Sequence, residues 1–517
     1  MTHRWKEFLQ WLADRSFQGQ IRQGVALRLL ADFLSVSAAL FLSFVFWFFF
    51  YAVVMHAPRL DQLADHFRAA ALKYWPLWSL AALLVFHWNG FYTRTRGYAS
   101  RYKALVVFRG VTFFVVVFVF ADYFLFRDAL LPRGVALLSW ILVLLGVGGS
   151  RYLKTAMLHD YTVEPRVSPE RVRQILVVGG AGYLGSLLVP ILLEKGYQVR
   201  VLDSLLFGAE ALRHVEGHPN FHLMTGDVRD IQSVVQAMTG CQAVVHLAAI
   251  VGDPACEVDR KLSVEINRAA TRMLIDVARG YDITRFLFAS TCSVYGASDF
   301  LMDEHSQLKP LSTYAHTKVD SEQLLLEARS EKFHPTILRL GTLFGLSPRP
   351  RFDLVVNLLT ARAATHGKIT IFNGQQWRPF LHVRDAARAF AMILEADLEK
   401  VSGQIFNAGD YAMNHQLSDI AAMISRLAPA LAVERVENED RRNYRVSFDK
   451  IHSLIGFRCG ITLDQGIREI FESVLSAKIA DFTAPEFNNQ AVTRTFAATA
   501  AADHSSLRAL QALATTE

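Results

Sequence analysis

The chain has 517 residues, which is enough for two or three domains that each bury a core of their own. Hydrophobic residues make up 52% of it and charged residues 20%, and the formal net charge is +6 at pH 7. The basic residues form no stripe with interleaved aromatic side chains, so the composition predicts no nucleic-acid partner. Scattered cysteines without a CxxC motif argue against a metal site or a disulfide framework: Cys241, Cys256, Cys292 and Cys459.

The first third of the chain is strongly apolar and predicts four transmembrane helices. A membrane-spanning helix needs about 20 apolar residues, with roughly 17 as the lower limit. The expected spans are residues 33–54, 74–91, 105–126 and 134–149, of which the second and fourth are marginal in length. Basic residues gather in segments 1–28 and 94–103, which predicts that both chain ends face the cytoplasm.

Four parts are expected in chain order. Residues 1–160 form a multi-pass region of the inner (cytoplasmic) membrane, and residues 161–173 form a polar, proline-containing linker. Residues 174–477 form a domain that faces the cytoplasm. Residues 478–517 are rich in Ala and Thr and lack a sustained apolar pattern, so we expect a disordered tail to which no function is assigned.

Short β-branched runs alternate with helical stretches after residue 174, which predicts an α/β fold of the Rossmann type with a doubly wound parallel sheet. The expected buried strands are residues 175–178, 198–203, 221–227, 243–249, 285–290 and 336–340. A turn is expected at residues 406–410. Helical stretches from there to residue 477 predict a smaller C-terminal lobe that binds the substrate.

A glycine motif, GGAGYLG, follows the first expected strand and opens a helix, with Gly179, Gly182 and Gly185 at GxxGxxG spacing. Glycines permit the tight turn and let the backbone approach a pyrophosphate, which then lies at the helix N-terminus. Asp203 ends the second strand, where a carboxylate binds the ribose hydroxyls of adenosine and repels a 2′-phosphate. The motif therefore predicts NAD, rather than NADP, as the cofactor.

Tyr314 and Lys318 stand four residues apart in STYAHTK, so they share one face of an expected helix. An unperturbed tyrosine has a pKa of about 10, and both an adjacent ammonium and a positively charged nicotinamide ring would favour its phenolate. Thr291 follows the fifth strand, where its hydroxyl could bind the substrate oxygen that is oxidised. An ordinary surface pair is the alternative for a tyrosine and a lysine at this spacing, but the strand and hydroxyl cluster upstream favour catalysis.

Residues 174–475 resemble the extended short-chain dehydrogenase/reductases, in particular the NAD-dependent nucleotide-sugar epimerase/dehydratase group. The motifs that carry the resemblance are GGAGYLG, Asp203, GDV, HLAA, Asn267, STCSVYG, YAHTK and RPFLHVRD, in the order and spacing of that family. The resemblance implies that Thr291, Tyr314 and Lys318 are catalytic and that the substrate is a nucleotide-diphosphate sugar. It is also compatible with a homodimer.

Further positions are assigned by the same resemblance. The implied cofactor-binding residues are Gly179, Gly182, Tyr183, Leu184, Gly185, Asp203, Asp227, Val228, Ala248, Ala249, Asn267, Tyr314 and Lys318. The implied substrate-binding residues are Thr291, Thr342, Asn357, Arg378 and Arg442. Arginine suits a diphosphate because its planar fork makes paired hydrogen bonds. Thr342 replaces an asparagine that often contacts the nucleotide, which leaves the base open, and His246 and His382 match structural histidines of the family.

Cys292 and Ser293 directly follow Thr291 and bear on the reaction. The 4,6-dehydratases typically carry Asp-Glu at these two positions, and UDP-glucuronate decarboxylases usually show a glutamate in place of Ser293. Neither side chain present suits the proton transfers of those reactions. The sequence therefore favours a 4-epimerase, in which a transient 4-keto sugar turns and is reduced on its other face.

The apolar region resembles the N-terminal part of membrane-bound polysaccharide-biosynthesis proteins, which implies a role in surface polysaccharide or glycolipid assembly. Two other functions stay open. One is an NDP-sugar oxidoreductase such as a 4-ketosugar reductase, or a dehydratase, that uses the same three catalytic residues. The other is a membrane scaffold that binds NAD or a nucleotide sugar without turning it over.

Overall fold

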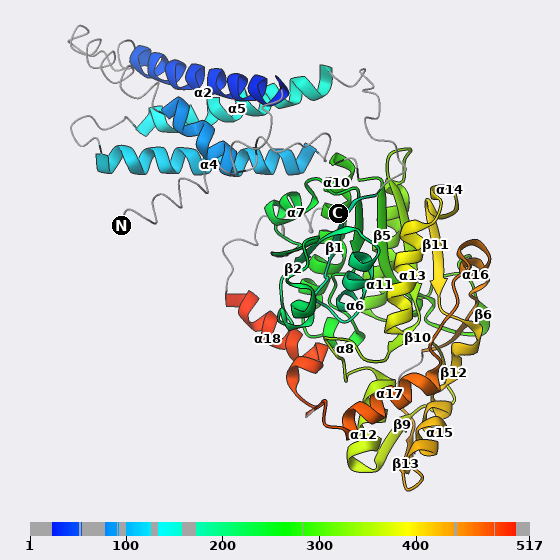
Figure 1. Ribbon diagram of the computed structural model, residues 1–517. Helices are drawn as coiled ribbons and strands as arrows, with labels where there is room; N and C mark the ends of the chain where they lie inside the picture. The colour runs from blue at the N-terminus through cyan, green and yellow to red at the C-terminus, as the bar shows by residue number, and fades with distance from the viewer. Residues whose placement is uncertain are drawn as a thin grey trace. The chain divides into compact units, whose positions relative to one another are not determined.

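A computed structural model of the chain describes residues 23–50, 53, 78–89, 91, 100–125, 133–157, 172–281, 283–438, 442–479 and 481–502. These residues divide into two compact units, one within residues 1–166 and the other from residue 167 onward, which are described separately (Figure 1). Of the predicted linker over 161–173, only the last two residues are among them.

The N-terminal unit consists, in its described part, of apolar helices that pack against one another. They are α2 (Gln23–Phe49), the helix Trp78–Trp88, α4 (Ser100–Leu125) and α5 (Arg133–Met157). Phe86 and Phe114 are fully buried among them, with ring centroids 6.0 Å apart. The Ser37 hydroxyl of α2 donates a hydrogen bond to the Ser79 hydroxyl at 2.9 Å, which ties two of the helices together.

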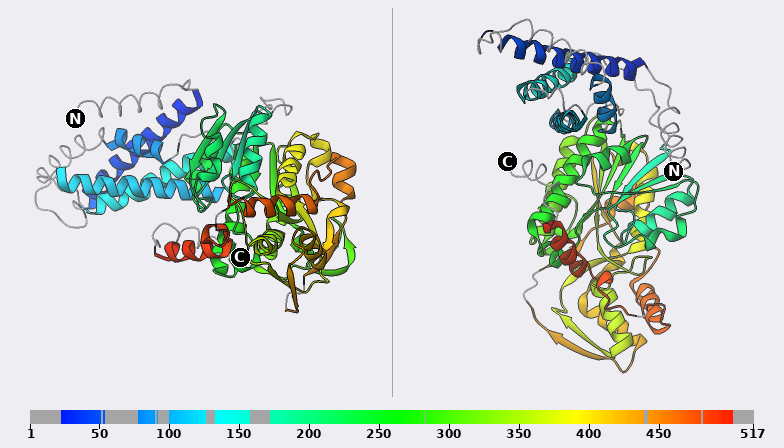
Figure 2. Two further views of the ribbon diagram at one scale, coloured as in Figure 1. Left: turned by 60° about the horizontal axis from the view of Figure 1, so that its bottom comes forward. Right: turned by 90° about the vertical axis from the view of Figure 1, so that its left-hand side faces the viewer.

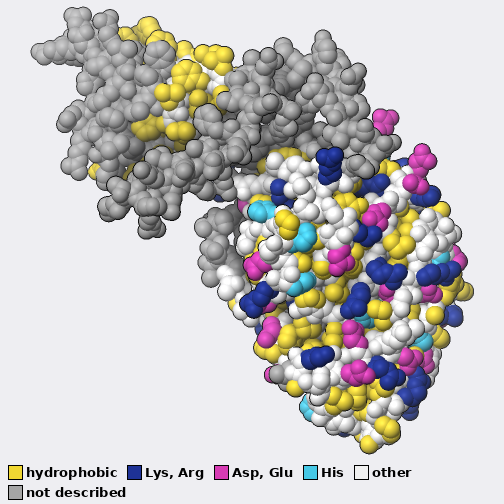
Figure 3. Space-filling model, viewed as in Figure 1, with side chains coloured by type: hydrophobic (Ala, Val, Ile, Leu, Met, Phe, Trp, Pro, Cys, Tyr) yellow, Lys and Arg dark blue, Asp and Glu magenta, His cyan; other side chains and the backbone are white. Residues whose placement is uncertain are grey.

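The described outer surface of this unit is apolar too. Leu84, Trp88 and Leu145 are 67%, 69% and 66% exposed, respectively. Hydrophobic side chains gather on the visible described surface of this unit, whereas charged side chains are spread over the C-terminal unit (Figure 3). Helices that are apolar on every side match a core or a membrane rather than water.

One of the described helices, over Leu29–Phe49, is long and apolar enough to cross a membrane, as judged by length and composition. The apolar parts of the other three are shorter, at Trp78–Trp88, Val107–Phe120 and Gly134–Ser150. The described residues therefore support one span where the sequence predicted four. The basic segments on which the predicted orientation rests lie largely outside the described residues.

The C-terminal unit is built on a seven-stranded sheet in which every neighbouring pair is parallel. In spatial order its strands are β11 (Gln404–Ala408), β7 (His334–Leu340), β5 (Arg285–Thr291), β4 (Ala243–His246), β1 (Gln174–Val178), β2 (Gln198–Asp203) and β3 (Phe221–Thr225). The predicted Rossmann-type fold is confirmed. The predicted turn at 406–410 is wrong at its start, because Phe406 and Asn407 pair with β7 inside β11.

Helices cover both faces of the sheet (Figure 2). On one face α6 (Gly185–Glu194) packs against α13 (Val383–Glu395). On the other, α10 (Ala270–Gly280) lies between α7 (Ile231–Met238) and α11 (Thr313–Ala328). Two-sided cover explains why the central strands are continuous apolar runs rather than alternating ones.

A smaller lobe lies beyond the carboxyl ends of the strands and has a core of its own. Its larger elements are β8 (Thr342–Phe344), α12 (Val355–His366), β9 (Lys368–Phe372), β10 (Trp377–His382), β12 (Asn414–Gln416), α15 (Leu417–Leu427), β13 (Ala432–Val436) and α17 (Leu463–Leu475). Shorter elements of the C-terminal unit are α8 (Asp253–Cys256), α9 (Arg260–Val264), η3 (Glu265–Ala269), η4 (Cys292–Tyr295), β6 (Ala297–Met302), α14 (Leu398–Val401), β14 (Asn443–Val446) and α16 (Asp449–Ile455).

The C-terminal segment corrects the prediction of a disordered tail over 478–517. Residues 481–502 contain a short turn of helix, η6 (Pro485–Phe487), and the helix α18 (Asn489–Ala502). The rings of Phe482 and Phe487 pack against Phe352, with centroid distances of 5.7 and 5.9 Å. These widely spaced aromatic anchors order a segment whose composition is otherwise polar and small. Residues 503–517 lie outside the described residues.

A buried ion pair joins α11 to the sheet. Glu322 of α11 and Arg339 of β7 are each 2% exposed, and Arg339 Nη2 lies 2.6 Å from Glu322 Oε2. The Ser290 hydroxyl of β5 donates to the same carboxylate, and Arg339 Nη1 donates to the Tyr295 hydroxyl at 3.0 Å. Each charge therefore has its partners inside the protein.

We predict that Glu322→Gln destabilises the fold by about 3–5 kcal/mol, because it leaves the buried Arg339 guanidinium without a counter-charge. The exposed Glu327 of the same helix supplies the matched control, since Glu327→Gln should change the free energy of unfolding by no more than about 0.5 kcal/mol. Denaturant unfolding of the detergent-purified chain measures both. Equal, small effects of the two changes would contradict the role assigned to the pair.

Candidate active site

A cleft of about 1190 Å³ lies in the C-terminal unit, where the carboxyl ends of the parallel strands face the smaller lobe. This is the edge at which open α/β sheets bind their ligands. The predicted site residues that line it are Gly179, Gly182, Tyr183, Leu184, Gly185, Asp203, Asp227, Val228, Ala248, Ala249, Thr291, Tyr314, Lys318, Thr342, Arg378 and Arg442. Asn267 and Asn357 are the two predicted residues that do not.

The glycine loop between β1 and α6 is shaped as a dinucleotide cradle. Gly179 has a φ of +85°, and a Cβ there would lie 2.6 Å from the backbone nitrogen of Ala248. A Cβ on Gly185 would lie 2.5 Å from the carbonyl oxygen of Gly179. Side chains at either position would therefore collide with backbone, so only glycine lets the loop close this tightly. The loop leaves the start of α6 open to a diphosphate.

Asp203 ends β2 beside this loop. Its carboxylate accepts hydrogen bonds from the backbone N–H of Ala181 at 2.9 Å and of Leu205 at 2.8 Å. Burial raises the pKa of this carboxyl, and the two backbone hydrogen bonds counter that effect. The carboxylate is thus held at the position where ribose hydroxyls are bound in this type of fold. The glycine cradle and the acid together fit NAD.

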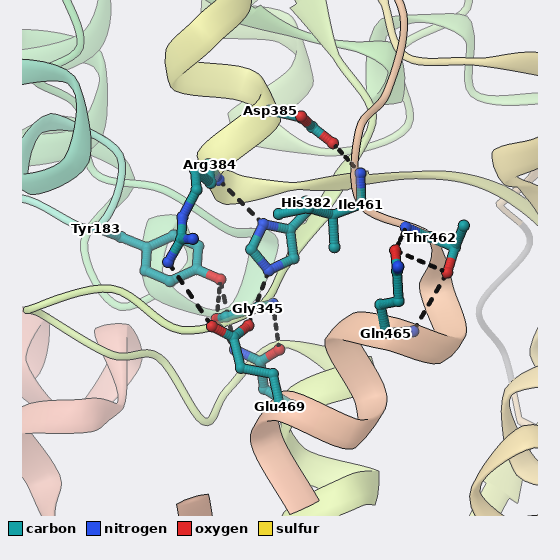
Figure 4. Close-up of polar contacts among 10 residues, drawn as sticks. Tyr183, Gly345, His382, Arg384, Asp385, Ile461, Thr462, Gln465 and Glu469 are labelled. Carbon is teal, nitrogen blue, oxygen red and sulfur yellow. Dashed lines mark hydrogen bonds and ion pairs between the residues drawn. The ribbon is translucent and has the colours of Figure 1, made fainter. Parts of the chain in front are cut away.

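Tyr183, which lines the cleft, and the buried Asn357 are both hydrogen-bonded to Gly345. The Tyr183 hydroxyl donates to the carbonyl oxygen of Gly345 at 2.6 Å (Figure 4). Asn357 is fully buried, and its amide binds both the N–H and the carbonyl of Gly345, at 2.9 and 3.0 Å, and the carbonyl of Arg351 at 2.8 Å. The prediction that Asn357 binds the substrate is therefore corrected, because its side chain is used in shaping the Gly345–Arg351 loop.

Asn267 likewise acts through the backbone. It is 2% exposed, accepts from the N–H of Ile250 at 2.8 Å and donates to the carbonyl of the same residue at 3.0 Å. Ile250 lines the cleft after β4. Asn267 therefore fixes the wall of the cofactor cleft without reaching it, which corrects its assignment as a direct contact.

The three predicted catalytic residues meet in the cleft. Thr291 is the last residue of β5, and its hydroxyl donates to the Ser293 hydroxyl at 3.1 Å. Tyr314 and Lys318 lie one turn apart on α11, with the Lys318 nitrogen 5.8 Å from the centre of the Tyr314 ring. Lys318 Nζ donates to the carbonyl of Ala289 at 2.7 Å, which fixes the ammonium between helix and sheet.

Burial has opposite effects on the two ionisable groups of this set. It raises the pKa of Tyr314, and the nearby Cys256 adds to that rise. It lowers the pKa of Lys318 to about 8, although Cys256 and Glu322 act in the other direction. Tyr314 is therefore a neutral phenol at pH 7 in the protein alone, so a further positive charge in the cleft is needed before it can serve as a base.

The side chains of the two residues after Thr291 lie in different surroundings, one in the protein interior and the other in the cleft. Cys292 is 1% exposed, donates from its thiol to the carbonyl of Arg339 at 3.3 Å, and does not line the cleft. Burial raises the pKa of this thiol, so it is not an acid or base near neutral pH. Ser293 does line the cleft, with its hydroxyl 3.4 Å from that of Tyr444.

The two histidines lie in structural positions. His246 Nε2 shares a hydrogen bond with the Thr271 hydroxyl at 2.9 Å, and burial lowers the pKa of this ring to about 3. His382 Nε2 lies 3.0 Å from Glu469 of α17, and its Nδ1 accepts from the backbone N–H of Arg384 at 3.2 Å (Figure 4). His382 therefore caps α13 and joins it to the smaller lobe.

Two predicted arginines lie near Ser293, whose hydroxyl is 3.4 Å from that of Tyr444. Arg442 Nη1 donates to Asp253 at 2.7 Å, and the Arg378 guanidinium lies 5.5 Å from the centre of the Tyr444 ring. Arg378 also donates to the carbonyl of Arg442. Both predicted arginines thus meet in one polar cluster, which suits a charged part of the substrate.

Several lining residues were not predicted. They include Arg349, Arg351, Asp353 and members of the C-terminal segment such as Asn489 and Phe496. The RPR sequence at 349–351, in the loop between β8 and α12, is a signal that could have marked the arginines. No local pattern marks Asn489, because its place depends on packing of distant aromatic residues.

Known proteins share these features. Residues 175–409 match the NAD dependent epimerase/dehydratase family. The chain is 30% identical over 318 residues to a dTDP-glucose 4,6-dehydratase of Actinoplanes sp., covering 57% of this chain and 96% of that protein. It is 28% identical over 253 residues to a UDP-glucose 4-epimerase of Corynebacterium glutamicum, covering 46% and 75%. A solved structure of MoeE5 in complex with UDP-glucuronic acid and NAD has a TM-score of 0.51 at 26% identity, covering 58% and 98%. The chain therefore belongs to the NAD dependent epimerase/dehydratase family, and NAD is its cofactor.

Proposed function

We infer that the chain is a membrane-held nucleotide-sugar 4-epimerase. The observation that carries this proposal is that Thr291, Tyr314 and Lys318 meet in a dinucleotide-binding cleft. The two residues that follow Thr291, Cys292 and Ser293, supply no carboxylate. The substrate is proposed to be a nucleoside-diphosphate sugar. UDP-sugars are the first to test, because the solved relative MoeE5 is bound to UDP-glucuronic acid.

In the proposed reaction the chain's own residues transfer one proton between the sugar and Tyr314. Tyr314 takes the proton from a sugar hydroxyl, and the hydroxyl of Thr291 hydrogen-bonds to the same oxygen. Lys318, held by the carbonyl of Ala289, stabilises the phenolate by its charge. NAD, when bound between the glycine loop and Asp203, supplies the hydride acceptor and a positive ring. After the sugar has turned, Tyr314 returns the proton to the same oxygen.

The surroundings of Thr291 favour epimerisation over water elimination. Elimination needs an additional acid and base near the sugar. The thiol of Cys292 is turned into the protein, and Ser293 is a poor proton carrier. Asp253 is a carboxylate that lines the cleft, and it already accepts from Ser312 at 2.6 Å and from Arg442 at 2.7 Å. Both of its oxygens are therefore hydrogen-bonded within the protein.

The apolar outer surface of the N-terminal unit supports attachment to a membrane. Side chains such as Leu84, Trp88 and Leu145 are more than half exposed on helices whose inner faces are also apolar. In water this arrangement would expose far more apolar surface than a soluble unit tolerates. We propose an inner-membrane location with the catalytic unit in the cytoplasm and a role in surface glycan assembly. The crossing number of four stays a prediction.

We predict that the purified chain converts an NDP-sugar into its C4 epimer without added NAD or NADH, because the proposed cycle restores the cofactor. The measurement is NMR of the products from a set of UDP-, dTDP-, GDP- and CDP-sugars. Consumption of one NADH per product would identify a reductase instead. A product lighter by one water would identify a dehydratase.

We predict that Tyr314→Phe lowers kcat by about 10²- to 10⁴-fold, the usual contribution of a general acid or base. NAD content should be unchanged, since only the phenol oxygen is removed. Tyr411→Phe is the matched control, because Tyr411 is 40% exposed and does not line the cleft. Full activity of the Tyr314 variant would overturn the catalytic assignment.

A pH profile tests Lys318 separately. Its pKa is lowered to about 8, so the ammonium is present below that pH and is lost as the pH rises through it. We predict that kcat/KM falls above about pH 8, because the phenolate loses its counter-charge. In Lys318→Met the rate should be low at every pH, without this falling limb. A limb that persists in the variant would assign it to another group.

For the N-terminal unit we predict that the full chain stays with the membrane after washing with high salt and with alkaline carbonate, and that detergent releases it. Apolar contact is insensitive to salt, whereas surface charge attraction is screened. Recovery of the chain in the salt wash would refute membrane embedding without affecting the enzymatic proposal.

A further inference from the structure

The C-terminal segment, residues 481–502, forms part of the wall of the catalytic cleft. Its lining residues are Phe482, Thr483, Phe487, Asn488, Asn489, Gln490 and Phe496. The segment lies beyond residue 409, where the family match ends. The family match therefore gives no account of its contacts with the cleft.

Several specific contacts hold the start of α18 against the cleft. The backbone N–H of Phe352 donates to the carbonyl of Phe487 at 3.0 Å. Asn489 is 5% exposed, and its Nδ2 donates to the carbonyl of Val251 at 3.1 Å. Its backbone N–H donates to Asp353 at 3.4 Å. The segment is thus joined both to the loop after β4 and to the loop before α12.

Further along α18, Phe496 reaches the adenine end of the cleft. The Arg229 guanidinium lies 5.5 Å from the centre of the Phe496 ring, and it pairs with Asp227 at 2.7 Å. Asp227 follows β3 and lines the same cleft. The helix therefore extends from the Arg349 loop to the residues beside the expected adenine position.

Arg349 is the group that this segment positions. It is 6% exposed, its guanidinium carbon lies 3.6 Å from the centre of the Phe207 ring, and its Nη2 donates to Asn489 Oδ1 at 2.8 Å. Among the described residues its Nε has no hydrogen-bond partner, although it is buried. Arg351 beside it is already paired with Asp353, at 2.7 Å.

The Nε of Arg349 has no acceptor among the described residues, and the side chain lines the cleft, so its charge is available to a ligand there. Leaving such a donor unsatisfied costs about 1–3 kcal/mol, and more when the group is charged. The Arg349–Arg351–Asp353 set has two positive charges and one negative charge, so the missing acceptor should be an anion. The carbonyl of Glu486 accepts from Arg349 Nη2 at 3.4 Å but carries no charge. Arginine recognises phosphate oxygens especially well because several of its donors lie in one plane.

We propose that Arg349, held in place by Asn489 of the C-terminal segment, binds a diphosphate in the cleft. Both ligands of the family carry such a group, the cofactor between its two nucleosides and the substrate between nucleoside and sugar. Phe207, on which Arg349 stacks, follows Asp203 closely in sequence, which places the cofactor's diphosphate first. The proposal rests on the proposed nucleotide-sugar cleft but not on the epimerase reaction, so it is tested by binding alone.

The test uses the full chain in detergent and three variants. Arg349→Gln removes the charge, and Asn489→Ala leaves the arginine but removes its positioning partner. Arg494→Gln is the matched control, because Arg494 is an exposed arginine on the same helix and does not line the cleft. NAD release is followed by the cofactor retained through gel filtration over time, and UDP binding by calorimetry. Thermal unfolding of each variant separates loss of binding from loss of folding.

We expect NAD release to be about 10- to 100-fold faster in Arg349→Gln, and about 10-fold faster in Asn489→Ala, than in the parent chain or Arg494→Gln. If NAD release is unchanged but UDP affinity falls by the same factor, the diphosphate is the substrate's. Unchanged NAD release and UDP affinity in both folded variants would overturn the proposal. Should Arg349→Gln fail to fold, the NAD release and UDP affinity of Asn489→Ala are judged by the same criteria.

Discussion

The buried ion pair between Glu322 and Arg339 is the contact on which the geometry of the catalytic set depends. Glu322 lies one helical turn after Lys318 on α11, and Arg339 lies on β7. Two charges inside a protein are tolerated only when each finds a partner and further hydrogen bonds. Here Ser290 binds the carboxylate, and Ser290 directly precedes Thr291. The pair therefore sets the position of α11 relative to the end of β5, where the three catalytic side chains meet.

The same network continues across the sheet. Arg339 also binds the hydroxyl of Tyr295, which donates to Asn407 Oδ1 of β11 at 2.7 Å. Tyr295 is fully buried, two residues after Ser293. A change at Cys292, whose thiol donates to the carbonyl of Arg339, would therefore also affect the strand that carries the ion pair.

Sequence patterns predicted the features that depend on local order along the chain. The strands, the glycine loop, Asp203 and the YxxxK pair all follow from periodicity and fixed spacing, and the structure brings them into one cleft. The resemblance to the family assigns Asn267 and Asn357 to ligands. Whether an amide reaches a ligand depends on which backbone groups surround it, and here Ile250 and Gly345 take up both side chains.

The C-terminal segment shows what local sequence patterns could not predict. Its composition is polar and small, so burial of Phe482 and Phe487 against Phe352 could not be read from a window of its own sequence. The first third of the chain differs, because its hydropathy alone identifies it as apolar. Hydropathy does not give the length of each continuous apolar helix, however, and only Leu29–Phe49 among the described helices reaches the length of a span.

The position of the C-terminal segment bears on the reaction class independently of Cys292 and Ser293. An enzyme that restores its cofactor in each cycle gains from slow release, whereas a reductase must exchange NAD(H) at every turnover. Asn489 is almost fully buried, and its side-chain amide and its backbone N–H are all hydrogen-bonded to cleft residues, so opening this wall would break several contacts at once. A wall held in this way favours retention of NAD. The side chains that follow Thr291 and the wall formed by α18 thus favour the same kind of reaction, one in which NAD stays bound through every cycle.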